Sequence, residues 1–194
     1  MNIYSKLFLI FSLIFLLNQE SKAQDEDFLK GRIFLSPDFG LLAGTITNIE
    51  VSPALGYYLS DRFCIAGGFI YKYYKQSGKY FDNFETNIYG PKAFARYTLI
   101  QNLGEILPVQ SNVEIIAHVE FESLSLDERY FGMNPVTTEG RFWYSTAIIG
   151  GGISQQSSER IKVNALILWD VDTSSRSPYS NPVFRFGIQF MLGK

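Results

Sequence analysis

Hydrophobic and polar residues alternate along eight stretches of the chain from residue 32 onward. The stretch NVEIIAHVEFE, residues 112–122, shows the pattern most clearly, with apolar residues at every second position between Val113 and Phe121. Such a period of two is typical of a β-strand whose two faces meet different surroundings. The eight stretches cover residues 32–42, 49–59, 63–74, 87–99, 112–122, 141–154, 161–171 and 182–194. They predict an all-β fold.

The predicted strands are long, and the segments between them differ in length. Each stretch runs for about 11 to 14 residues, whereas most globular strands have about 5 to 6 and a tilted strand needs about 9 to 11 to cross a membrane. At one end the connections 60–62 and 155–159 are short and 100–112 is intermediate. At the opposite end the connections 74–87, 123–139 and 172–182 are long and polar, although 43–48 is short. Short turns at one end and longer loops at the other are typical of outer-membrane barrels. We therefore predict an eight-stranded antiparallel up-and-down transmembrane β-barrel, in which Pro37, Pro53 and Pro91 each remove one ladder donor.

The polar face of these strands mixes ionisable residues with small ones, and we expect it to line a narrow interior. A luminal polar network is predicted from Asp38, Glu50, Lys92, Arg96, Glu114, His118, Glu120, Glu122, Lys162, Asp170 and Arg185. Basic and acidic residues fall on neighbouring strands, so that they can pair. The apolar face carries aromatic residues near the strand ends, at Tyr57, Tyr71, Tyr73, Tyr89, Tyr97 and Trp169. Such rings suit the headgroup layer of a membrane, so we expect outer-membrane lipid as a partner of this face.

The last strand carries a short motif. In RFGIQFML, Arg185, Gly187, Phe190 and Leu192 follow the order polar residue, glycine, aromatic residue and apolar residue. This spacing resembles the C-terminal assembly signal of small outer-membrane β-barrel proteins of the OmpX-like and OmpA-barrel type. The resemblance implies that the barrel-assembly machinery is a partner of the chain and that the protein lies in a bacterial outer membrane. The alternating row of Phe184, Phe186, Ile188, Phe190 and Leu192 is then expected to face lipid.

The N-terminal residues read as a targeting segment. Lys6 precedes the apolar run LFLIFSLIFLL, and small residues follow at Ser21 and Ala23. This is the pattern of a secretory signal peptide at residues 1–23, with cleavage expected between Ala23 and Gln24. The apolar run is shorter than the roughly 20 residues of a membrane-spanning helix. Residues 24–31 are then a periplasmic lead-in, and residues 32–194 are the barrel domain.

Composition narrows the function classes. Removal of residues 1–23 takes Lys6, Lys22 and Glu20 from 17 basic and 19 acidic residues, leaving 15 and 18. Because the remaining chain is mildly acidic, we expect no nucleic acid as a partner. The single cysteine, Cys64, has no partner for an internal disulfide. We expect no cofactor, and no metal site, since a lone histidine among acidic residues is too common a pattern to indicate one.

Catalysis and binding each have a candidate. His118 is the only histidine and shares a face with Glu114, Glu120 and Glu122, which is an acid–base pattern without an accompanying nucleophile motif. We interpret these residues as a structural network and expect no catalytic residue. Aromatic side chains in the long loops, Tyr80, Phe81, Phe84, Tyr130, Phe131 and Met133, are candidates for an extracellular ligand.

Three functions remain open at this stage. A structural or recognition and adhesion role is favoured, because the predicted interior is filled and the loops are exposed. The first alternative is an outer-membrane enzyme acting on lipid, a hydrolase or acyltransferase on the same barrel. The second is a soluble lipocalin-like carrier, which would point its apolar row inward and whose family signature of an early Gly-x-Trp is missing.

Overall fold

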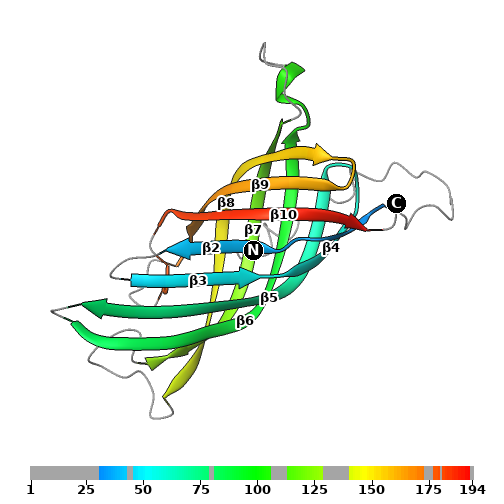
Figure 1. Cartoon of the computed structure of the whole chain (residues 1–194). Helices are drawn as coiled ribbons and strands as arrows, with labels where there is room; N and C mark the ends of the chain where they lie inside the picture. The colour runs from blue at the N-terminus through cyan, green and yellow to red at the C-terminus, as the bar shows by residue number, and fades with distance from the viewer. Residues whose placement is uncertain are drawn as a thin grey trace, which may run out of the picture.

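The computed structural model of the 194-residue chain describes residues 31–42, 46–78, 81–105, 113–128, 140–172, 177–179 and 181–192, with the side chains of 41–47, 76–84 and 105 left aside. The described residues form one antiparallel sheet of ten strands (Figure 1). The strands are β1 (Ile33–Leu35), β2 (Asp38–Leu42), β3 (Ile46–Ser52), β4 (Ala54–Tyr58), β5 (Phe63–Gly78), β6 (Phe81–Ile100), β7 (Val113–Asp127), β8 (Arg141–Ser158), β9 (Ile161–Asp170) and β10 (Val183–Leu192). One short 3-10 helix, η2 (Leu103–Glu105), follows β6. The predicted all-β antiparallel class is confirmed. The predicted signal peptide, its cleavage site and most of the lead-in lie outside the described residues.

Ten strands replace the eight predicted because two prolines each divide one predicted strand. Pro37 separates β1 from β2, and Pro53 separates β3 from β4. Proline has no backbone N–H to give to a ladder, so the strand pattern is interrupted there. The register nevertheless runs on across the break, since Ile33 pairs with Leu192 and Phe39 pairs with Phe186, six residues further along both strands. Pro91, by contrast, lies within β6 opposite Phe69 without dividing the strand.

From β5 to β10 each strand pairs with the next strand along the chain, and β10 also pairs with the first two strands. The pairings run from β5 through β6, β7, β8 and β9 to β10. β10 pairs with both β1 and β2, which pair in turn with β4 and β3, and these two pair with β5. The series of pairings therefore returns to the strand from which it started.

Two of the long loops predicted from polarity are shorter than expected. β5 continues to Gly78 and β6 begins at Phe81, so most of the segment 74–87 belongs to these two strands. Their paired ends extend past the end of the neighbouring strand β3 (Figure 1). β7 likewise continues to Asp127. Polar residues in these segments indicated loops. Paired strands nevertheless tolerate polar side chains where neither face of the sheet meets an apolar environment. Of the candidate loop residues, Phe81 and Phe84 lie in β6, while the structure leaves aside their side chains and the positions of Tyr80, Tyr130, Phe131 and Met133.

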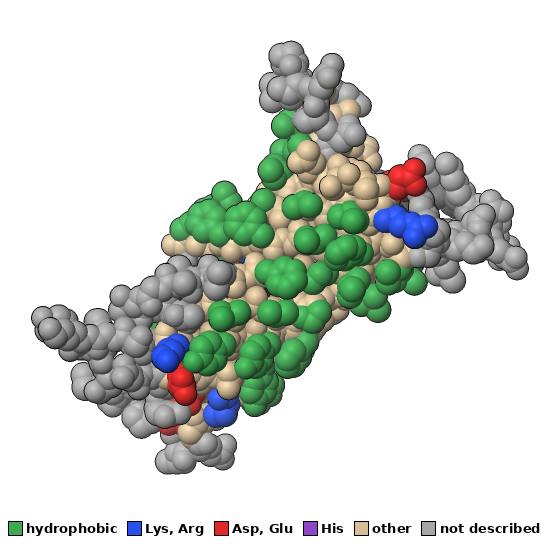
Figure 2. Space-filling view, in the orientation of Figure 1, with side chains coloured by type: hydrophobic (Ala, Val, Ile, Leu, Met, Phe, Trp, Pro, Cys, Tyr) green, Lys and Arg blue, Asp and Glu red, His purple; other side chains and the backbone are tan. Residues whose placement is uncertain are grey.

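The two faces of the sheet differ in chemistry. The outer face carries large apolar side chains, and Phe186, for example, is 61% exposed. Figure 2 shows these side chains spread over the strands in view, whereas Lys, Arg, Asp and Glu appear near the strand ends. On β6 the outward positions from Tyr89 to Leu99 are all apolar or aromatic, over eleven residues. This band has the height of a tilted strand that crosses hydrocarbon.

The inner face is buried and contains both apolar clusters and charges. One apolar cluster consists of Phe34, Ala54, Cys64, Ala66 and Phe94. Two more lie nearer the β9–β10 connection and share a contact with Tyr179; they consist of Ile70, Ile88, Leu124, Leu126 and Tyr144, and of Ile116, Ile148, Leu166 and Leu168. Ionisable side chains fill the space between these clusters.

Candidate functional site

The residues predicted as a luminal polar network have their side chains on the inner face. Buried members are Asp38, Lys92, Arg96, His118, Glu120, Glu122, Asp170 and Arg185, and half-buried members are Glu50, Glu114 and Lys162. They do not form a single site. The structure brings most of them into a central ionic cluster and places Asp170 and the Lys162–Glu114 pair in separate groups.

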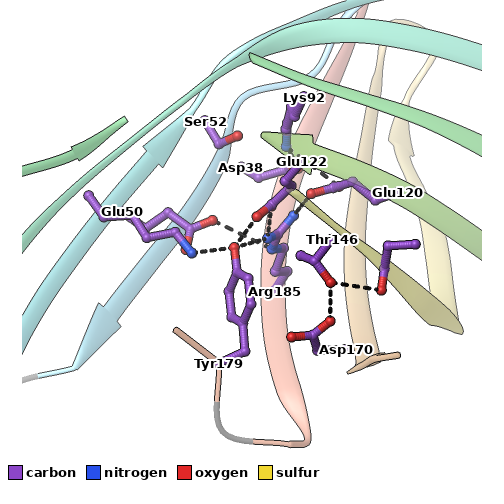
Figure 3. A network of polar contacts seen from close by, with 12 residues as sticks. Asp38, Glu50, Ser52, Lys92, Glu120, Glu122, Thr146, Asp170, Tyr179 and Arg185 are labelled. Atoms are coloured by element: carbon purple, nitrogen blue, oxygen red, sulfur yellow. Dashed lines mark hydrogen bonds and ion pairs between the residues drawn. The ribbon is translucent and has the colours of Figure 1, made fainter. Parts of the chain in front are cut away.

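The central ionic cluster consists of Asp38, Glu50, Lys72, Lys92, Glu120, Glu122 and Arg185 (Figure 3). Arg185 lies at its centre, on β10. Its Nη1 donates to Glu120 Oε1, its Nη2 donates to Glu122 Oε1 at 2.5 Å, and its Nε lies 3.5 Å from Glu50 Oε1. Because β7 supplies Glu120 and Glu122 and does not pair with β10, these bonds connect strands on opposite sides of the interior. Charge-assisted bonds of this kind are strong and directional.

Two lysines complete the cluster. Lys92 Nζ donates to Asp38 Oδ2 at 2.8 Å and lies 3.8 Å from Glu120 Oε2. Lys72 Nζ lies 3.3 Å from Glu50 Oε2. The cluster therefore sets four carboxylates against three cations, and each cation contacts at least one carboxylate. Lys72 was missed in the sequence interpretation, although it has the same parity as Cys64 and so falls on the inner face.

Tyr179 reaches the cluster from the connection between β9 and β10. Its hydroxyl accepts a bond from Lys72 Nζ at 2.5 Å and donates one to Glu122 Oε2, while Lys72 Nζ also lies 3.9 Å from the ring centroid. Burial, followed by the charge of Glu122, raises the pKa of the Tyr179 hydroxyl well above its usual range. The phenol stays protonated as a donor. No sequence pattern signalled this residue, because a tyrosine in a polar connection resembles an exposed loop residue.

Asp170 holds the same connection in place through a separate set of bonds. Thr146 and Ser177 donate their hydroxyls to its carboxylate. The Asp170 backbone N–H donates to Asn181 Oδ1 at 2.7 Å, and Asn181 Nδ2 donates back to the Asp170 carbonyl at 3.0 Å. Tyr144 donates to Asp172 at 2.5 Å. These bonds fix the segment that carries Tyr179 against the end of the sheet.

His118 is held between a cation and an anion. Arg96 Nε donates to His118 Nδ1 at 3.1 Å, which requires Nδ1 to be unprotonated. The other ring nitrogen, Nε2, lies 3.1 Å from Glu120 Oε2 and is then the N–H donor. The guanidinium of Arg96 also lies 4.5 Å from the centroid of the Phe94 ring. Both nitrogens of the imidazole are thus engaged, in a tautomer set by Arg96.

The end of the interior nearest the β4–β5 turn holds one further pair and a small cavity. Lys162 Nζ donates to Glu114 Oε1 at 2.7 Å. The cavity has a volume of about 10 Å³ and is lined by Arg96, Glu114, Asn164 and other polar side chains. In the described part of the chain, no cluster of His, Cys, Asp and Glu is suited to hold a metal ion. The described residues also contain no helix that is long and apolar enough to cross a membrane.

The four residues of the C-terminal motif divide between the two faces of β10. Arg185 and Gly187 are buried, Phe190 is half-buried, and Leu192 is exposed. Gly187 lies opposite Asp38 in the ladder, and a Cβ at this position would collide with Asp38 Oδ1. The glycine therefore leaves room for the Asp38 carboxylate that binds Lys92. This packing role is independent of any role of the motif in assembly.

No protein-family model matches the chain, and the search of curated proteins finds no match either. Among solved structures, the chain is similar to the N-terminal β-barrel domain of Pseudomonas aeruginosa OprF, with a TM-score of 0.44 and 11% sequence identity over 83% of this chain and 97% of that domain.

Proposed function

We propose that this protein is an integral outer-membrane protein, an eight-stranded barrel with a side-chain-filled interior and a structural or recognition role at its loops. The observation that carries the proposal is the orientation of the two faces. Large apolar side chains such as Phe186 and Trp169 are exposed on the strands, while Arg185, Glu120 and Glu122 are buried.

This orientation is the reverse of a soluble barrel. A lipocalin-like carrier keeps apolar side chains inside around a cavity and polar ones outside. In this chain a contiguous apolar outer surface would contact water at a cost proportional to its area. Lipid removes that cost. In the described part of the chain the strand pairings continue from β10 to β1 and β2, which supports a barrel with few unpaired edges for lipid to contact. Outer-membrane lipid is therefore the partner we assign to the outer face.

The register supports the strand count that we propose. β1 with β2, and β3 with β4, each keep one register across their proline. Counting each pair as one interrupted strand gives eight, a size whose interior is just filled by side chains. The central ionic cluster and Tyr179 occupy that interior, so we expect no solute channel. We therefore assign a structural role to the barrel and a recognition role to the loops, and we expect an extracellular ligand as the partner of the loops.

Assembly is the second part of the proposal. Arg185, Gly187, Phe190 and Leu192 match the order of the C-terminal signal, and we propose that the barrel-assembly machinery reads this strand. Gly187 and Arg185 also have structural partners, so a variant of either residue would affect folding for two reasons. Leu192, which is exposed, is the better position to test the signal alone.

The alternative of a lipid-modifying enzyme has less support. His118 would have to act as the base, yet Arg96 occupies Nδ1 and Glu120 occupies Nε2. The imidazole is also buried, at 4% exposure. A general base must lie within hydrogen-bond reach of the proton it removes, and this ring is enclosed by its own partners. We expect replacement of His118 to change stability and not to remove a lipid-modifying activity.

The orientation is tested by thiol accessibility in membranes. Cys64, the only cysteine, is buried at 2% exposure, so the unchanged protein serves as the inward control. The test variant carries Phe186→Cys in a Cys64→Ser background. In outer-membrane vesicles we expect the thiol introduced at position 186 to be labelled by a membrane-soluble maleimide and not by a charged one. Cys64 should be labelled by neither reagent until the protein is unfolded. Labelling at position 186 by the charged reagent, or recovery of the protein from the periplasm without detergent, would contradict the proposal.

A further inference from the structure

The small cavity at the end of the interior nearest the β4–β5 turn is surrounded by hydrogen-bond donors that have no acceptor. Among the described residues, Arg96 Nη1, Arg96 Nη2 and Asn164 Nδ2 are buried and have no hydrogen-bond partner. Both side chains line the cavity, and they are 5% and 1% exposed. A buried donor without a partner costs free energy, and a buried guanidinium costs more than a neutral group.

The guanidinium is held in position by other contacts, so it cannot turn away from the cavity to find a partner. Its Nε donates to His118 Nδ1 at 3.1 Å, and its plane lies over the Phe94 ring with 4.5 Å between Cζ and the centroid. His118 separates Arg96 from Glu120 and the rest of the central ionic cluster. The two terminal NH₂ groups of Arg96 therefore remain directed away from the cluster's carboxylates.

The charges that line the cavity favour an anion. Arg62 and Arg96 line it, and Glu114 is its only acidic lining residue in the described part of the chain. Glu114 already accepts from Lys162 Nζ at 2.7 Å. Tyr58 also lines the cavity; its hydroxyl oxygen accepts from Gln189 Nε2 at 2.8 Å, which leaves the phenolic proton to donate.

Size and donor number together select the occupant. The centre of a water-sized sphere can move within only about 10 Å³ of the cavity, so a small monatomic occupant suits it better than a carboxylate or phosphate. A water molecule could donate to the hydroxyl oxygens of Thr98 and Ser154, which also line the cavity, but its two lone pairs would leave one of the three unpartnered donors without an acceptor. A monatomic anion accepts from all of them and compensates the charge of Arg96. We propose that the cavity binds a single halide ion, chloride in the cell.

Halide dependence of stability tests the site. The protein is refolded in detergent in sodium chloride, sodium bromide or sodium gluconate of equal ionic strength, and its melting temperature is followed. Because a ligand that binds only the folded state stabilises it with the logarithm of its concentration, we expect the melting temperature to rise by a constant increment for each tenfold increase in chloride or bromide, and not with gluconate. Arg96→Met should remove the increment, while Arg160→Met, which removes an arginine from the exposed β8–β9 turn, should retain it.

A direct measurement on the unchanged protein covers the case in which Arg96→Met does not fold. Crystals grown in sodium bromide should give an anomalous peak between Arg96 and Asn164. Equal stabilisation by chloride and gluconate, or bromide peaks only elsewhere on the molecule, would mean that the cavity holds water and would overturn the proposal.

Discussion

The residues on the two faces of β10 are constrained by their surroundings in two different ways. On the inner face, Arg185 and Gly187 each meet particular atoms, namely the oxygens of Glu120, Glu122 and Asp38. On the outer face, Phe184 and Phe186 are 58% and 61% exposed and have few protein neighbours to fit. The inner positions are therefore defined by individual partners, and the outer positions are defined by a class of residue.

This difference gives opposite expectations for conservative and drastic changes. An inner position should be sensitive to a change of one functional group, because removing that group leaves the charge of its buried partner unpaired. An outer position should accept any large apolar residue and reject a charge. Four variants test this contrast, each followed as the urea dependence of the folded fraction on an unheated gel.

The largest effect is expected for Arg185→Met. Removal of the guanidinium leaves Glu120 and Glu122 buried without their strongest partner, and the loss of one member of a buried ionic group costs about 3 to 5 kcal/mol. The compensating variant Arg185→Met with Glu120→Gln and Glu122→Gln should recover most of this loss, because no charge is then left unpaired. If the triple variant were less stable than the single one, the cost would come from packing and not from charge.

The next largest effect is expected for Phe186→Arg on the outer face. If the outer band faces lipid, as we propose, a charged residue near its middle costs about 2 to 4 kcal/mol. The matched change Phe186→Leu keeps the face apolar and should cost about 1 kcal/mol or less. Equal effects of the two changes would indicate that Phe186 packs against protein, and the contrast between the faces would fail at this position.

The alternating pattern was sufficient to predict the faces because strand parity is a local property. Once residues such as Val119 and Glu120 alternate, the strand direction sends them to opposite sides of the sheet. The antiparallel class was predicted from the lengths of the connections and not from the alternation. Long-range contacts carry no such local signal: that Asp38 pairs with Lys92, or Glu120 with Arg185, depends on which strands face each other across the interior.

The strand ends and the interruptions were predicted less well. Pro37 and Pro53 were expected to disturb the ladder, but only the pairing shows that they divide strands while Pro91 does not. The segment 74–87 was expected to be a loop because it is polar, yet most of it belongs to the paired strands β5 and β6. Tyr179 was missed because its position depends on the fold of a connection and not on periodicity.

A smaller effect is expected for Gly187→Ala. A Cβ at this position would collide with Asp38 Oδ1, so the carboxylate must move away from its bond with Lys92. Overpacking of a buried site costs about 1 to 3 kcal/mol. The control is Gly67→Ala, which has nothing within 4 Å of its Cβ and should leave stability unchanged or raise it slightly. A loss for Gly67→Ala as large as that for Gly187→Ala would contradict the steric explanation.

The smallest effect is expected for Tyr179→Phe. This variant tests whether an inward side chain from a connection, and not from a strand, also depends on individual partners. The change removes the hydroxyl that bridges Lys72 and Glu122 but keeps the ring over the Lys72 ammonium. Each charge also retains another partner, Glu50 for Lys72 and Arg185 for Glu122. We therefore expect a loss of about 1.5 kcal/mol, the lower end of the range for a hydrogen bond to a charged group.

The pH dependence of that loss separates the hydroxyl from general packing. Because burial raises the pKa of Tyr179 above its unfolded value of about 10, its contribution is fully present below pH 10 and is lost only as pH rises toward the folded pKa. The stability difference between the unchanged protein and Tyr179→Phe should be constant from about pH 6 to 9 and should decrease above about pH 10, whereas a loss of packing alone would not change with pH. The control Tyr71→Phe removes an exposed hydroxyl that donates to Asn87 at 2.7 Å and should cost less than about 0.5 kcal/mol. An equal loss in both variants would place Tyr179 with the outer positions, where no single partner decides stability.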